Sequence, residues 1–222
     1  MAHPDDAEFS AGGTIARWVG AGTVVDYCLC TRGDKGTDDP DAKPADVAAV
    51  REREQLAAAK VLGVRSVRFL GHPDGVLENT LSLRRDIVAV IRELKPDAVI
   101  CPDPMRRYGP TFSNHPDHRA AGDAALDAVF PSARDPLVFP QLRRTGLQPH
   151  RVKEVFVANP ANEPTVAVDI STTLETKITA LREHRSQVTE ERLREFIPQR
   201  AAEMGQAAGL AAAELFYRIA LP

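Results

Sequence analysis

The chain has 222 residues, of which 43% are apolar and 27% charged, and its net charge is −3. These values favour one domain over residues 1–222 with a buried core, and they exclude a disordered chain and a generic polyanion-binding surface, so no nucleic-acid partner is expected. Three cysteines without CxxC spacing argue against disulfides and favour a reducing cytoplasm, and the sequence lacks the long apolar run of a membrane span.

Helical patterns alternate with short apolar β-type runs along the first half of the chain. The periodicity predicts helices over residues 10–20, 45–62 and 81–94, and strands over residues 23–31, 66–70 and 98–101. This alternation indicates βαβ units. It predicts a Rossmann-like α/β fold, with a mostly parallel sheet, helices on both faces, and functional loops at the carboxyl ends of the strands.

The second half continues with a predicted helix over residues 118–129 and an irregular, proline-containing loop to His150. Strands are predicted near residues 152–158 and 165–169. From Ser171 the chain is predicted to be helical to its end, with an interruption near Pro198. One helical face would contain Met204, Ala208, Ala211, Leu215 and Ile219.

The first cluster with chemical potential is His3-Pro4-Asp5-Asp6, at a predicted turn into a helix. Imidazole nitrogen and carboxylate oxygen both bind divalent metals, so His3 and Asp6 are candidate ligands. Asp5 between them is then a candidate general base for a metal-activated water. The alternative is a terminal histidine followed by a carboxylate that caps the helix.

The second cluster is Asn114-His115-Pro116-Asp117-His118, which follows a predicted strand and opens another helix. His118 is the candidate third metal ligand, giving a His-Asp-His set with room for water and substrate. His115 is a candidate for stabilising an oxyanion or protonating a leaving amine. The alternative is a capped helix start with two solvated histidines.

A third cluster, His72-Pro73-Asp74-Gly75, also follows a predicted strand. It competes for the metal role, because spacing alone does not decide which of the three clusters meet. Lacking a second acid or histidine nearby, it is the poorest ligand set. We therefore interpret Asp74 as an acceptor for substrate hydroxyls, the alternative being a plain turn.

Taken together, these motifs resemble the LmbE-like, or PIG-L, family of zinc-dependent N-deacetylases. The resemblance rests on the motif at residues 2–8 with its following glycines, on Thr31-Arg32-Gly33-Asp34, on the charged run at residues 51–54, on residues 115–119, and on His184-Arg185-Ser186-Gln187. It implies a Rossmann-like fold and removal of an acetyl group from N-acetylglucosamine conjugates or related amides.

The resemblance also implies roles for single residues. Zinc would be held by His3, Asp6 and His118, although iron(II) suits the same set. Asp5 matches the family's general base and His115 its electrostatic partner. Arg51 and Asp74 match the positions that contact substrate hydroxyls in sugar-processing relatives. The sequence alone instead favours a solvated charge run at residues 51–54. Relatives of this size often form trimers or hexamers.

Two departures from the family pattern stand out. Relatives have apolar strand residues before the first motif where this chain has only Met1 and Ala2, which we expect to be the remaining part of a truncated central strand. Some relatives have a tyrosine where this chain has Ser113, so Tyr108 is the candidate for polarising the substrate carbonyl. Two other functions remain open: an amidase for thiol conjugates or natural-product intermediates, and a non-catalytic carbohydrate-binding relative.

Overall fold

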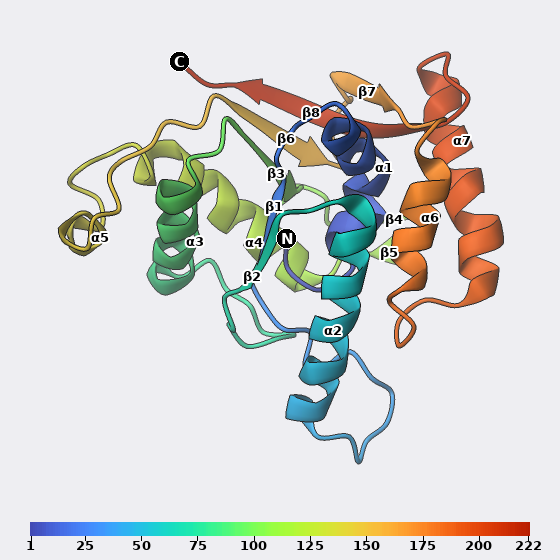
Figure 1. Cartoon of the computed structure of the whole chain (residues 1–222), viewed down its shortest axis with the longest axis horizontal. Helices are drawn as coiled ribbons and strands as arrows, with labels where there is room; N and C mark the ends of the chain where they lie inside the picture. Colours follow the sequence, from blue (N-terminus) through green and yellow to red (C-terminus); the bar gives the residue numbers. More distant parts are fainter. The chain divides into compact units, whose positions relative to one another are not determined.

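The computed structural model describes all residues 1–222 (Figure 1). These residues fall into two compact units. Unit 1 comprises Met1, His3–Asp74 and Val166–Leu215, and unit 2 comprises Ala2, Gly75–Thr165 and Phe216–Pro222. No helix combines the length and the apolar character needed to cross a bilayer. A single domain over residues 1–222 stays a prediction.

Unit 1 contains two parallel strands and a group of helices. Strands β1 (Asp26–Leu29) and β2 (Ser66–Phe69) pair in parallel, with Asp26 opposite Ser66. Helix α6 packs against both α1 and α2, as the orange, blue and cyan ribbons show (Figure 1). The unit's other elements are α1 (Asp6–Gly20), α2 (Pro44–Leu62), β7 (Val166–Asp169), α6 (Leu174–Arg182), a π-helical segment (Arg192–Phe196) and α7 (Ile197–Ala207).

Met1 hydrogen-bonds along β1. Its amino group donates to the Cys28 carbonyl at 2.8 Å, and the Cys30 N–H donates to the Met1 carbonyl at 2.9 Å. Met1 therefore forms the backbone contacts expected of a strand residue beside β1, and it leads the chain into the turn at His3.

Unit 2 contains a second parallel pair. Strand β3 (Ala98–Pro102) is parallel to β6 (Glu154–Ala158), so the mostly parallel α/β class is confirmed. Helix α3 (Leu81–Leu94) has the predicted bounds, because its apolar residues recur on one face and Thr80 caps its first turn by accepting from the Leu83 N–H. The remaining elements are β4 (Tyr108–Gly109), β5 (Phe112–Ser113), α4 (Pro116–Asp127), a π-helical segment (Ala128–Ser132) and α5 (Pro140–Arg144).

The prediction of a helix to the end of the chain is wrong. Residues 213–220 form a strand, β8 (Ala213–Ala220), whose later part pairs antiparallel with β6, Ala220 opposite Glu154. The spacing of Ala211, Leu215 and Ile219 imitates a helical face, but pairing with β6 decides the conformation. The predicted interruption near Pro198 corresponds to a change of helix type, because the π-helical segment ends at Phe196 and α7 begins at Ile197, with Pro198 in its first turn.

A buried ion pair lies against the middle of α1. The Glu214 carboxylate accepts from the N–H groups of Gly13 (3.0 Å) and Thr14 (2.7 Å), and Lys177 Nζ lies 2.6 Å from Glu214 Oε1. The same Nζ donates to the Phe9 carbonyl at 2.8 Å. In a regular helix the N–H of Gly13 would donate to the carbonyl of Phe9. Here Glu214 binds that N–H and Lys177 binds that carbonyl, so the ion pair contacts both groups of one helical hydrogen bond.

Replacing Gly13 by alanine is expected to lower the free energy of unfolding by about 1–3 kcal/mol, because a core without spare space resists an added methyl group. A Cβ atom at Gly13 would lie 2.7 Å from Ile170 Cβ and Cγ2. Chemical denaturation measures the effect. Gly20→Ala is the matched control, since no atom lies within 4 Å of its added Cβ atom. Equal loss in both variants would contradict the packing explanation.

Candidate active site

His3 lies in the turn before α1, buried between two carboxylates of unit 1. Its Nε2 is 3.0 Å from Asp74 Oδ1, and its Nδ1 is 3.6 Å from Asp6 Oδ2. Burial by itself lowers the pKa of His3, but the hydrogen bonds and charges of Asp6 and Asp74 outweigh it and raise that pKa to about 10. The surroundings of His3 therefore favour a positive charge.

Asp74 comes from the third sequence cluster, and the structure brings it to His3. Its second oxygen accepts from the Lys35 N–H at 2.8 Å, and the residue is only 4% exposed. Burial raises the pKa of Asp74, but the bonds from His3 and Lys35 prevail and lower it to about 2. With Nε2 of His3 bound to this carboxylate, Nδ1 is the nitrogen that can bind a metal. A substrate contact by Asp74 stays a prediction.

Asp5 has a left-handed backbone conformation, with φ 91° and ψ −26°. Its N–H donates to Gln55 Oε1 at 2.9 Å, and its Oδ2 accepts from Arg51 Nη2 at 3.1 Å. Burial and the neighbouring charge of Asp6 raise the pKa of Asp5 to about 7 against the opposing effect of Arg51. A carboxyl group with a pKa near neutrality can both take and return a proton, as a general base must.

Arg51 is buried behind Asp5. Besides Asp5, its guanidinium donates to the Pro4 carbonyl at 2.7 Å and to the Gly33 carbonyl at 3.2 Å. A Cβ atom at Gly33 or Gly36 would lie 2.4 Å from Arg51 Nη1, so both glycines make room for the guanidinium. The solvated-run interpretation is wrong for Arg51, and its contact with substrate stays a prediction.

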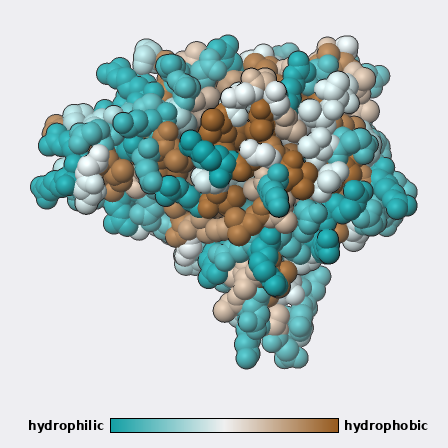
Figure 2. Space-filling view, in the orientation of Figure 1, coloured by the Kyte–Doolittle hydropathy of each residue, from teal (hydrophilic) through white to brown (hydrophobic).

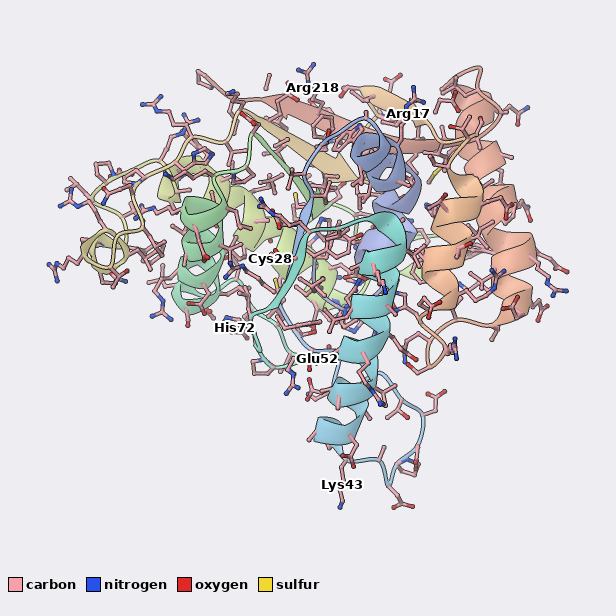
Figure 3. All side chains as sticks on the ribbon, in the orientation of Figure 1. Arg17, Cys28, Lys43, Glu52, His72 and Arg218 are labelled. Carbon is pink, nitrogen blue, oxygen red and sulfur yellow. The ribbon has the colours of Figure 1, made fainter.

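The other charged residues of this run face away from Asp5. Glu52 pairs with Arg32, and Glu54 accepts from the N–H and hydroxyl of Ser186 at 2.8 and 2.6 Å. Figure 3 shows Glu52 on α2, with Lys43 just before the start of that helix. The surface at this end of α2 is mostly hydrophilic (Figure 2). The run therefore has one buried member and several at the surface.

In unit 2, the second cluster forms the start of α4. The Asp117 N–H donates to His115 Nδ1 at 3.2 Å, and His118 Nδ1 lies 3.2 Å from Asn114 Oδ1. With Nδ1 of His118 donating to that amide oxygen, Nε2 is the nitrogen whose lone pair can bind a metal. The His115 side chain is 45% exposed, whereas Asp117 is fully buried and accepts from the N–H groups of Gly75 and Leu77.

The hairpin before α4 contains both Ser113, which stands where some relatives have a tyrosine, and Tyr108, the candidate to replace that tyrosine. Tyr108 of β4 lies directly opposite Ser113 of β5 and is 81% exposed. A role for Tyr108 in polarising a carbonyl stays a prediction.

The sequence did not identify the buried polar side chains near Asp5. Glu8, Gln55 and His184 are all fully buried. Glu8 and His184 belong to motifs that support the family resemblance, but the sequence predicted no role for either residue. Gln55 carried no signal, because a glutamine in an Ala-rich helix matches no pattern.

Comparison with known proteins places these features in context. The family model "PIG-L: GlcNAc-PI de-N-acetylase" matches residues 1–129. Diacetylchitobiose deacetylase of Thermococcus kodakarensis is 36% identical over 193 residues, covering 85% of this chain and 68% of that protein. The 1D-myo-inositol 2-acetamido-2-deoxy-alpha-D-glucopyranoside deacetylase of Rhodococcus erythropolis is 32% identical, covering 85% and 79%. The structure of N,N'-diacetylchitobiose deacetylase from Pyrococcus horikoshii matches with a TM-score of 0.90 at 30% identity, covering 98% and 81%.

Proposed function

Because the chain belongs to the PIG-L, or LmbE-like, family of deacetylases, we propose that it hydrolyses the N-acetyl group of an amino sugar. The observation that carries this proposal is the turn before α1, where Asp5, with a pKa of about 7, directly follows Pro4 and the carboxylate-bound His3. The Thermococcus and Rhodococcus relatives, both deacetylases of N-acetylated sugars by name, support the substrate class.

The donor atoms fit a divalent metal. His3 and Asp6 offer one imidazole nitrogen and one carboxylate oxygen in unit 1, and we assign the third ligand to His118 of unit 2. The carboxylate of Asp74 on the second nitrogen of His3 is the outer partner that metal-bound histidines usually have. Zinc is the first choice and iron(II) the second. When bound, the ion supplies Lewis acidity toward the acetyl carbonyl and toward water.

The chain's own residues then move protons and stabilise charge. Asp5 takes a proton from the water that attacks the acetyl carbon, and returns it to the amine nitrogen as the C–N bond breaks. Acetate and the free amine are the products. Because Nδ1 of His115 accepts from a backbone N–H, the proton of its ring is on Nε2, where it can donate to the developing oxyanion.

Acetate release measures this activity directly. Protein purified without added metal is expected to release acetate from N-acetylglucosamine or N,N'-diacetylchitobiose, and elemental analysis identifies the ion. Release from an N-acetylated thiol conjugate alone would favour the alternative amidase. The absence of both acetate and metal would favour a non-catalytic carbohydrate-binding relative.

The assembly state and cellular location stay predictions. A trimer or hexamer would appear as a mass of three or six chains by light scattering, and fractionation of the source cells would test the cytoplasmic location.

A further inference from the structure

We infer that Arg51 and Gln55 of α2 clamp the peptide group between Pro4 and Asp5, and that Gln55 is thereby a positioning residue for the Asp5 carboxylate. The inference rests on the proposed function, in which Asp5 is the general base. Gln55 is fully buried, so it acts through Asp5 and does not contact a substrate.

The clamp holds both polar groups of one peptide. Arg51 Nη2 donates to the Pro4 carbonyl at 2.7 Å, and Gln55 Oε1 accepts from the Asp5 N–H at 2.9 Å. The two side chains are four residues apart on α2, so they lie on the same face of the helix, one turn apart. With its C=O and its N–H both bound to one rigid helix, the peptide plane cannot rotate without breaking a buried hydrogen bond.

The orientation of the Gln55 amide is set by Glu8. Gln55 Nε2 donates to Glu8 Oε1 at 2.9 Å, which leaves Oε1 of Gln55 to accept from the Asp5 N–H. The second oxygen of Glu8 lies 3.4 Å from Nε2 of the fully buried His184. A continuous series of buried polar groups therefore leads from the end of α6 to Asp5.

The conformation of Asp5 shows what the clamp must hold. A non-glycine residue at φ 91° is unfavourable and persists only where its surroundings impose it. Helix capping does not account for it, because the Asp5 side chain makes no cap hydrogen bond to α1. The turn instead directs the carboxylate toward Arg51 Nη2, which also holds the preceding carbonyl.

Gln55→Leu tests the clamp, because leucine keeps most of the side-chain volume and removes both hydrogen bonds. We expect kcat for acetate release to fall roughly 10²-fold, as a misplaced catalytic group costs, with KM and metal content unchanged. Amide hydrogen exchange at Asp5, measured without substrate, is expected to accelerate. Unchanged exchange and unchanged kcat would overturn the inference, as would a loss of kcat explained wholly by lost metal.

Exchanging the side chains of Glu8 and Gln55 distinguishes a loss of the clamp from simple misfolding. Gln55→Glu places two carboxylates in contact and is expected to be nearly inactive. Adding Glu8→Gln reverses the two roles, so that the carboxylate now at position 55 accepts from the Asp5 N–H and from the amide now at position 8. Most of kcat is then expected to return. A double variant no more active than Gln55→Glu alone would contradict the clamp.

Ser186→Ala is the matched control. It removes the hydrogen bond that the Ser186 hydroxyl donates to Glu54, the neighbour of Gln55, and it leaves the contacts of Asp5 unchanged. Its kcat and its exchange at Asp5 are expected to equal those of the wild type, and a loss as large as that in Gln55→Leu would overturn the inference. If wild-type protein releases no acetate while exchange at Asp5 still responds to Gln55→Leu, the proposed function fails and the clamp stands.

Discussion

Asp5→Asn is expected to lower the turnover of acetate release by about 10²–10⁴-fold, the usual contribution of a general base. Asparagine has the same shape and tolerates the left-handed backbone of this position, so the fold and the metal content should be unchanged. Its amide cannot take a proton from water. Initial rates, elemental analysis and circular dichroism on the same preparation measure the three properties.

Asp41→Asn is the control for this prediction. Asp41 is exposed in the loop before α2 and contributes to neither the metal set nor the clamp. Its turnover is expected to match that of the wild type. Wild-type turnover in Asp5→Asn would sink the assignment of Asp5 as the base, whereas loss of metal in that variant would make Asp5 a ligand.

Lys177→Met is expected to lower the free energy of unfolding by about 3–5 kcal/mol, because it leaves the buried Glu214 carboxylate without its cation. Domains of this kind are stable by only about 5–15 kcal/mol, so the variant is expected to be marginal at 37 °C. The side chains of Lys177 and Glu214 are 7% and 3% exposed, which removes most of the solvent screening. Urea denaturation followed by circular dichroism measures the change.

Two further variants isolate the buried charge. Adding Glu214→Gln to Lys177→Met removes the charge and keeps an oxygen for one of the two N–H groups of Gly13 and Thr14, so it is expected to restore part of the loss. Lys153→Met removes an exposed pair with Asp97 and should leave stability nearly unchanged. Equal stability of Lys177→Met and Lys153→Met would show that the buried pair contributes nothing.

The elements predicted best from the sequence are those whose local pattern agrees with their packing. Helix α3 has both a regular apolar face and a capping threonine, and its bounds agree with the prediction. The end of the chain fails for the opposite reason, because its alanines and leucines favour a helix locally. Pairing with β6, about 60 residues earlier, imposes a strand, as Phe156 opposite Arg218 shows.

The residues of the candidate site also fall into those that the sequence predicts and those that it does not. Ligand chemistry makes His3, Asp5 and Asp6 candidates for a metal-dependent hydrolytic site, because of their residue types and their place before a helix. The supporting contacts were out of reach, because Asp5 and Gln55 are separated by 50 positions and Gly13 and Glu214 by 201. No local pattern records a contact over such a distance. For the same reason the charged run at residues 51–54 reads as a solvated helix face, and only the fold shows that its first residue is buried.

The glycines at 33 and 36 have a practical consequence for anyone altering this protein by mutational libraries. Their missing side chains leave the space that the Arg51 guanidinium occupies, so randomising either one would displace an arginine that holds the Pro4 carbonyl. Apparent gains or losses of selectivity from such a library would then reflect the loss of the Arg51 contacts to Pro4 and Asp5. Diversity is better introduced between Thr37 and Lys43, a mostly exposed stretch that precedes α2.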